Sequence, residues 1–177
     1  DPFVDENYLE LFKKNGYIVK PFVTFIADMK KNIDELWSNV HHSARGDVKR
    51  AKRRNVTVKE LENIDELKSY LLLHQEWAKT KGLTISQPFS ELDNLWNNFQ
   101  KGLENFFLAY QDGKLISALR VSCFNRMAHV NFILSSYSNA TSVGGPALSW
   151  YAVEWAKKND IRLYDFSGGP KLEENSK

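Results

Sequence analysis

Three extended segments follow one another closely in the second half of the chain, and this arrangement constrains the fold more than any other feature. They span residues 106–111, 115–124 and 128–136. Residues 112–114 (Asp-Gly-Lys) and 125–127 (Asn-Arg-Met) separate them, and turns this short join neighbouring strands in hairpins. The sequence therefore predicts an antiparallel meander of three strands.

Helices and strands on either side of the meander complete a pattern. Before it, we expect a strand at residues 56–61 and helices at 65–81 and 90–101, capped by Asp65 and Ser90. After it, we expect a helix from Pro146 to about Lys158 and a short strand at 162–166. The order β-α-α-β-β-β-α-β predicts an α+β fold with a mixed, mostly antiparallel sheet flanked by helices, and it resembles the GNAT acyltransferase fold.

A long amphipathic helix is expected ahead of this pattern. Apolar residues recur every three or four positions between Ile33 and Arg54, which places them on one stripe of a helix. Gly46 within that stretch predicts a kink or a break. Further towards the N-terminus, Gly16 ends a short helix, and Pro21 confines the extended run after it to an edge strand.

Basic residues concentrate at the end of the long helix. The net charge is only +2, yet six basic residues between Arg45 and Arg54 face the single Asp47. Arg45, Lys49 and Lys52 share one flank, and we predict that this flank binds a phosphate of a nucleotide-linked precursor or of tRNA. The alternative is a solvated helix end whose cations complement the helix dipole.

Composition narrows the chemistry further. Cys123 is the single cysteine, and the four histidines show no metal-ligand spacing, so we expect neither a disulfide nor a metal site. The lone cysteine favours a reducing, cytoplasmic setting. The longest apolar stretch, residues 106–110, is far shorter than the roughly 18 residues that span a bilayer, so we expect no membrane-spanning segment. Because the chain begins at Asp1 without a methionine or a leader, we interpret it as a piece of a longer polypeptide.

Several stretches together resemble the FemABX family, the aminoacyl-tRNA-dependent peptidyltransferases that build interpeptide bridges on peptidoglycan precursors. The resemblance runs from about Tyr17 to Gly169. It rests on the order and spacing of residues 24–29 (Thr-Phe-Ile-Ala-Asp-Met), 36–37 (Leu-Trp), 45–56, 107–118, 128–132, 145–156 (beginning Gly-Pro-Ala-Leu-Ser-Trp) and 164–169 (Tyr-Asp-Phe-Ser-Gly-Gly).

The resemblance implies a division of the chain. Members of the family carry two GNAT-like halves, and this chain resembles the second half with the last strand of the first. We therefore interpret residues 1–30 as the end of a preceding half or a linker, 31–54 as a long basic helix, and 55–177 as a GNAT-like domain truncated at its C-terminus. The family usually continues into a Phe-Lys-x-x-Phe-Gly segment with a lysine implicated at the active site, and this chain ends before it.

The resemblance also implies an activity. By this resemblance, the chain would be an acyltransferase that forms an amide by transferring an aminoacyl or acyl group to an amine of a cell-wall or glycan-linked precursor. The acceptor would be a nucleotide- or lipid-linked glycan precursor, the donor an aminoacyl-tRNA, and no cofactor would be bound. Two alternatives remain open: a CoA-dependent GNAT N-acetyltransferase, and a non-catalytic GNAT-like module that binds a partner.

The loop before the last helix bears on the donor. CoA-dependent GNAT enzymes use a Gln/Arg-x-x-Gly-x-Gly/Ala loop to aim backbone N–H groups at a pyrophosphate. Here Ser142 replaces the Gln or Arg and Pro146 has no N–H, so CoA is the less favoured donor. Gly144 and Gly145 remain candidates for binding phosphate; otherwise they serve a tight turn.

Polar residues near the expected opening of the sheet are the candidates for chemistry. Amide formation needs a deprotonated amine and a stabilised oxyanion, so we expect Asp165 and Tyr137 to be catalytic and Asn131 to bind substrate. The alternatives are a carboxylate that caps the turn at Gly168 and a tyrosine that packs at the rim. The five tryptophans are expected in the core, with Trp77, beside Lys81, assigned to an acceptor groove.

Overall fold

A mixed sheet organises the computed structural model, which describes residues 6–18, 22–84, 88–136 and 143–170. Within these ranges six strands lie in the order β1-β6-β5-β4-β3-β2, and all neighbours are antiparallel except β5 and β6. The strands are β1 (Phe22–Asp28), β2 (Thr57–Glu60), β3 (Glu104–Gln111), β4 (Lys114–Phe124), β5 (Met127–Ser135) and β6 (Leu163–Pro170). The predicted α+β class, with a mostly antiparallel sheet flanked by helices, is confirmed.

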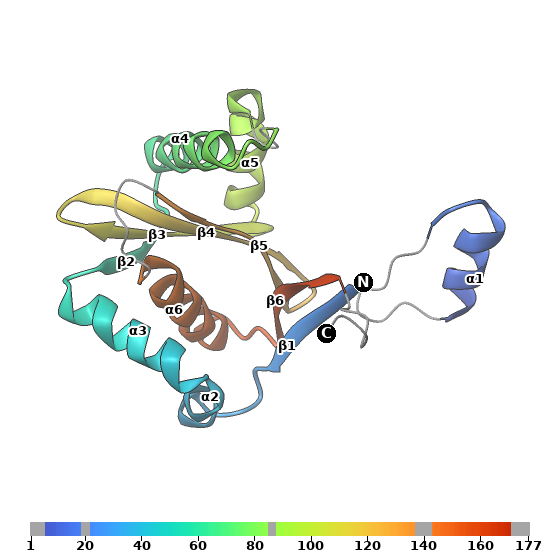
Figure 1. Ribbon diagram of the computed structural model, residues 1–177, viewed down its shortest axis with the longest axis horizontal. Coiled ribbons are helices and arrows are strands. Elements are labelled where there is room, and N and C mark those ends of the chain that lie inside the picture. Colours follow the sequence, from blue (N-terminus) through green and yellow to red (C-terminus); the bar gives the residue numbers. More distant parts are fainter. Residues whose placement is uncertain (1–5, 19–21, 85–87, 137–142, 171–177) are drawn as a thin grey trace.

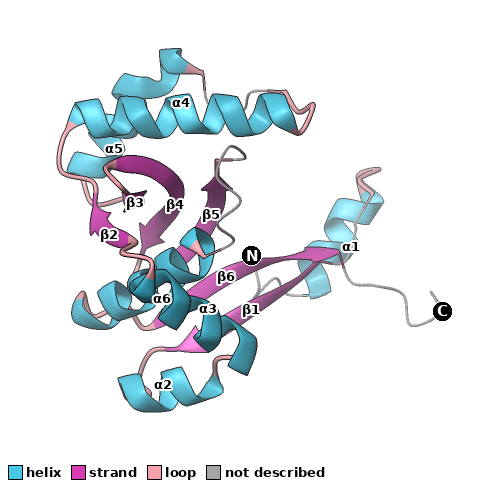
Figure 2. Ribbon diagram, turned by 60° about the vertical axis from the view of Figure 1, so that its left-hand side comes forward, coloured by secondary structure: helices cyan, strands magenta, loops and turns pink. Residues whose placement is uncertain are grey.

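Helices cover both faces of the sheet (Figure 1). They are α1 (Glu6–Lys14), α2 (Ile33–Asn39), α3 (His42–Arg53), α4 (Ile64–Thr80), the 3₁₀ turn η1 (Phe89–Glu91), α5 (Leu92–Gln100) and α6 (Gly144–Lys158). Helices α4 and α5 lie on one face, α6 lies on the other, and α2 and α3 pack outside α6. Helix α1 lies to one side of the rest of the molecule in Figure 1 and is drawn at the far end of the β1 and β6 ribbon in Figure 2.

The predicted meander is strands β3, β4 and β5. Its turns place Asp112 and Gly113, then Asn125 and Arg126, at positive φ, the backbone conformation that tight hairpins with right-handed strand twist require. In the register of β4 and β5, Arg120 pairs with Phe132 and the next residue with Val130. Asn131 is therefore an extra residue, a bulge that changes which side chains of β5 face each layer.

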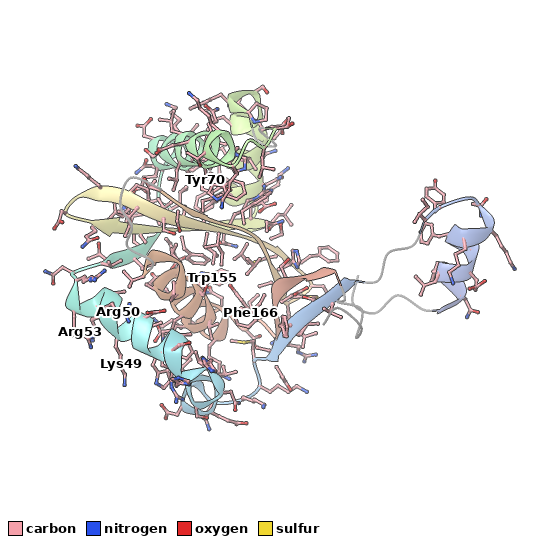
Figure 3. The ribbon with its side chains drawn as sticks, viewed as in Figure 1. Lys49, Arg50, Arg53, Tyr70, Trp155 and Phe166 are labelled. Atoms are coloured by element: carbon pink, nitrogen blue, oxygen red, sulfur yellow. The ribbon has the colours of Figure 1, made fainter. Side chains whose placement is uncertain are left out.

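Two apolar clusters fill the layers on either side of the sheet. Ala128 and Val130 belong to the cluster under α6, whereas Phe132 and Leu134, beyond the bulge, pack under α4 and α5. Trp155 is buried in the first cluster. Figure 3 shows Tyr70 of α4 and Trp155 of α6 on opposite sides of the sheet.

The long helix predicted over Ile33–Arg54 is instead two helices. Helix α2 ends at Asn39, Val40 is extended, and the ring of His41 accepts a hydrogen bond from the Ser43 N–H as the cap of α3. Gly46 lies within α3, so the expectation of a break there was wrong. The break occurs at His41 because its side chain satisfies a backbone donor that would otherwise begin α3 without a partner.

Two predicted caps also differ. The side-chain oxygen of Asn63, not Asp65, caps α4 by accepting from the Asp65 and Glu66 N–H groups. Ser90 lies in the 3₁₀ turn before α5, and α5 has no side-chain cap.

Candidate active site

Strands β5 and β6 part shortly after they meet. They pair over three residues, Met127–His129 with Leu163–Asp165. Beyond that point β5 continues beside β4, whereas β6 continues beside β1 as a two-stranded ribbon that leaves the rest of the sheet (Figure 2). The sheet therefore opens between β5 and β6, and His129 and Asp165 are the last paired residues before the opening.

The Asp165 carboxylate is enclosed and has three donors. It accepts from the Thr24 hydroxyl of β1, from His129 Nδ1 at 3.0 Å and from the Ser167 N–H at 2.8 Å. Burial alone would raise the pKa of Asp165, but the hydrogen bonds from Thr24, His129 and Ser167 outweigh it and hold the pKa below its ordinary value. Asp165 is therefore a carboxylate at neutral pH.

The pair of Asp165 and His129 can act as a general base. Because the carboxylate accepts the Nδ1 proton, the imidazole presents the lone pair of Nε2 for accepting a proton. The His129 side chain is 44% exposed and that of Asp165 only 4%, so a substrate amine reaches the imidazole more readily than the carboxylate. This geometry makes Asp165 a positioning residue. Its contact with the Ser167 N–H lies within β6, at the irregularity in the pairing with β1, and Gly168 continues the strand instead of forming a turn that Asp165 could cap.

A second polar cluster lies beside the pair on the same face of the sheet. Arg120 and Glu104 form a bidentate ion pair, with N–O distances of 2.8 and 2.7 Å. The Ser122 hydroxyl lies 3.0 Å from Glu104 and 2.8 Å from Asn131, and Ser122 is opposite His129 in the register of β4 and β5. Asn131 is the bulge residue of β5, and its side chain lies on the α4 and α5 side of the sheet together with that of His129.

An apolar cavity of about 420 Å³ lies on the other face of the same opening. Ile133 lines it from β5 and Phe166 from β6, which are the two strands that part. Phe166 directly follows Asp165, and successive strand residues point to opposite faces, so the cavity and the His129–Asp165 pair lie on opposite sides of one gap. The other lining residues come from α2, α3, the residue after α2, and α6: Trp37, Val40, Ala44, Val48, Gly145, Pro146, Ser149, Trp150 and Val153.

The two glycines at the start of α6 differ in their surroundings. A Cβ added to Gly144 would lie 2.8 Å from Ser117 Cβ, so the close approach of α6 to β4 requires a glycine there. Gly145 lines the apolar cavity, where an added Cβ would make an ordinary 3.6 Å contact with Ile133. Phosphate binding by this pair stays a prediction.

The predicted basic flank lies on α3, and its members differ. Arg45 Nη1 donates to the Ser38 carbonyl at 2.8 Å and to the Trp37 carbonyl at 3.4 Å, which ties α3 to the end of α2. Lys49 and Lys52 are exposed. Figure 3 shows Lys49, with its neighbours, on the outer helix of the α6 layer.

The remaining predicted residues are not brought together with that flank. Half-buried Trp77 belongs to α4 and packs against the apolar cluster beneath that helix, with its ring centroid 6.0 Å from that of His74. Lys81 follows the end of the same helix, so both residues lie on the face opposite α3. Tyr137 lies outside the described residues. Sequence reasoning missed His129 and Thr24, since neither belongs to a local motif with Asp165.

Comparison with known families and structures identifies the fold. Residues 40–174 match the acetyltransferase (GNAT) domain family, and the chain belongs to this family. FemX has a TM-score of 0.76 and 15% identity, with 97% of this chain and 62% of FemX covered. L-PGS from Bacillus licheniformis has a TM-score of 0.66 and 16% identity, with 97% of this chain and 52% of L-PGS covered. An aminoglycoside acetyltransferase from an uncultured soil sample has a TM-score of 0.56 and 11% identity, with 70% of this chain and 83% of the acetyltransferase covered.

These likenesses confirm the predicted resemblance to FemABX proteins at the level of the fold. The chain spans about three fifths of FemX and half of L-PGS, at 62% and 52% of their lengths. No curated protein matches the sequence. In the described ranges no helix has the length and apolar character to cross a membrane, and no group of three or more potential ligands there is arranged for a metal ion.

Proposed function

We propose that the chain is the acyl-transferring part of an aminoacyltransferase that forms an amide with an amine of a cell-wall or other glycan-linked precursor. The observation that carries the proposal is the His129–Asp165 pair at the parting of β5 and β6, with the apolar cavity on the other side of the same gap. A base and an apolar binding space at one opening suit a reaction between an amine and an activated acyl group.

In the proposed reaction the amine approaches from the α4 and α5 face. Its proton passes to His129 Nε2 as nitrogen attacks the carbonyl carbon of an aminoacyl ester, so the C–N bond forms and the C–O bond of the ester breaks. The proton on His129 then goes to the departing ribose oxygen of the tRNA, which leaves as a hydroxyl. Asp165 stabilises the imidazolium between these steps and holds the ring in one tautomer.

The start of α6 supports an aminoacyl-tRNA donor over CoA. Pro146 offers no N–H, Gly144 is packed against Ser117, and the apolar side chains of α2 and α3 form the neighbouring wall. A pyrophosphate would gain few donors there. The resemblance of the sequence segments to the FemABX family supports a nucleotide- or lipid-linked glycan precursor as acceptor. An aminoacyl-tRNA donor would place the reaction in the cytoplasm.

The membership in the acetyltransferase family favours one alternative, a CoA-dependent N-acetyltransferase. The test assays the chain with aminoacyl-tRNA and a UDP-linked muramyl peptide, and in parallel with acetyl-CoA. We expect aminoacyl transfer, with kcat lowered about 10²- to 10⁴-fold by His129→Gln. His42→Gln, at an exposed histidine of α3, is the matched control and should leave kcat unchanged.

Micromolar binding of CoA with acetyl transfer would establish the alternative and overturn the aminoacyl proposal. Full aminoacyl transfer by a folded His129→Gln variant would overturn the role of His129 as the base.

A further inference from the structure

The lining of the apolar cavity excludes a charged occupant. Among the described residues that line it, Ser149 carries the one hydroxyl and none has a charged side chain. The indoles of Trp37 and Trp150 meet at 4.5 Å between ring centroids and form part of the wall. A phosphate would find no partner in this space, whereas an apolar group would be shielded from water.

The size of the cavity points to a bulky group. Its volume is about 420 Å³, and an apolar cavity of about 150 Å³ is enough to hold benzene. A leucine or phenylalanine side chain with the adjoining acyl carbon therefore fits. A hydrogen or a methyl group would leave most of the wall without contacts and would gain little binding energy.

The position of the cavity connects it to the reacting atoms. Phe166 lines it, and the preceding residue is Asp165, which holds His129 on the other face of the sheet. A side chain anchored between α3 and α6 would direct its carbonyl carbon to the gap between β5 and β6. The amine and the base would meet that carbon from the α4 and α5 face.

We infer that the apolar cavity selects the donor: it receives a leucine- or phenylalanine-sized side chain of the aminoacyl group and discriminates against glycine and alanine. The inference rests on the proposed function. The expected kcat/KM is about 10- to 200-fold higher for Phe-tRNA or Leu-tRNA than for Ala-tRNA, which is the discrimination that apolar pockets achieve.

The test fills the cavity from α3. Ala44 lines it and is half-buried, so Ala44→Phe should lower the ratio of kcat/KM for Phe-tRNA to that for Ala-tRNA at least about tenfold. Ala44→Ser, which keeps the size of the side chain, should leave the ratio unchanged. Circular dichroism melting of both variants checks that they are folded.

A binding measurement gives a second readout without turnover. N-acetyl-leucinamide should change the tryptophan fluorescence through Trp37 and Trp150, and N-acetyl-alaninamide should not at the same concentrations. Ala44→Phe should weaken the leucinamide response at least about tenfold.

The outcomes separate the two hypotheses. Aminoacyl transfer with equal use of Ala-tRNA and Phe-tRNA, or a ratio unaltered in a folded Ala44→Phe variant, would overturn the inference and leave the proposed function standing. Absence of transfer from every aminoacyl-tRNA would overturn the proposed function and the inference together.

Discussion

Asp165 is held in one orientation by donors from three places in the chain. Thr24 lies on β1, His129 on β5, and the Ser167 N–H on β6 itself. An enclosed carboxylate with this many donors is both a structural link and a means of fixing the tautomer of the histidine. The two roles can be separated with a substitution that keeps the size of the side chain.

Asp165→Asn is expected to reduce catalysis more than stability. The amide nitrogen would donate to His129 Nδ1, so the proton of the neutral ring would move to Nε2 and the base would be lost. We expect kcat to fall about 10²- to 10⁴-fold and the free energy of unfolding at pH 7 to fall by about 1–3 kcal/mol. Steady-state kinetics and urea unfolding measure the two effects, with Thr24→Ser, which keeps the hydroxyl, as the control.

The stability effect of this substitution should depend on pH. Folding lowers the pKa of Asp165, so its stabilisation is present above the ordinary value of 3.8 and is lost as the pH falls through the folded value. The difference between wild type and Asp165→Asn should therefore be larger at pH 7 than at pH 3. An equal difference at both values would contradict the assignment of Asp165 as an ionised acceptor.

The break between α2 and α3 shows where a periodic pattern misleads. Val40 lies after the end of α2, and Ala44 and Val48 lie on α3, yet all three line the same cavity. The apolar spacing therefore continues across the break because both helices present one face to α6. His41 and its bond to Ser43 are the local signal that the periodicity conceals.

The basic end of α3 gives a prediction for this element. Lys49 and Lys52 are exposed, so Lys49→Ala/Lys52→Ala should weaken the binding of tRNA by the protein without changing its melting temperature. The slope of log K against log salt should decrease by about 1 for each phosphate that the variant no longer neutralises. Filter binding at several salt concentrations measures this slope.

Two control variants sharpen this test. Arg50 pairs with Asp47 at 3.2 Å, so Arg50→Ala should have a smaller effect on binding. Arg45→Ala removes the bonds to the end of α2, so it should lower the melting temperature. Unchanged tRNA affinity in the double variant would identify the cluster as a solvated helix end.

Across the whole molecule, local sequence signals predicted the order of the elements, whereas the long-range contacts that form the site were not predicted. The turns at 112–114 and 125–127 determine the meander, and the helix and strand after it follow the predicted order. The site depends on contacts that no local pattern contains: His129 and Asp165 are 36 residues apart, and Thr24 and Asp165 are 141 apart. The register of β5 with β6 and of β1 with β6 brings them together.

Strand β1 bears on whether residues 1–30 belong to a preceding half or to the GNAT-like domain. The sequence places residues 1–30 in a preceding half or a linker, yet β1 pairs with β6 from Phe22 to Asp28. Gly168 has no room for a Cβ because the backbone of Val23 lies against it, and the next residue after β1, Met29, is 2% exposed in the core. Strand β1 therefore belongs to the same packed unit as the candidate site.

Two shortened chains separate α1 from β1. A chain that begins at Val19 loses α1, whose Tyr8 and Leu11 are exposed, and should keep the melting temperature of the full chain. A chain that begins at Met29 also loses β1, which uncovers the edge of β6 and removes the Thr24 hydroxyl from Asp165. Its melting temperature should fall by about 10 °C or more. Equal melting of the two shortened chains in calorimetry would instead assign β1 to the preceding half.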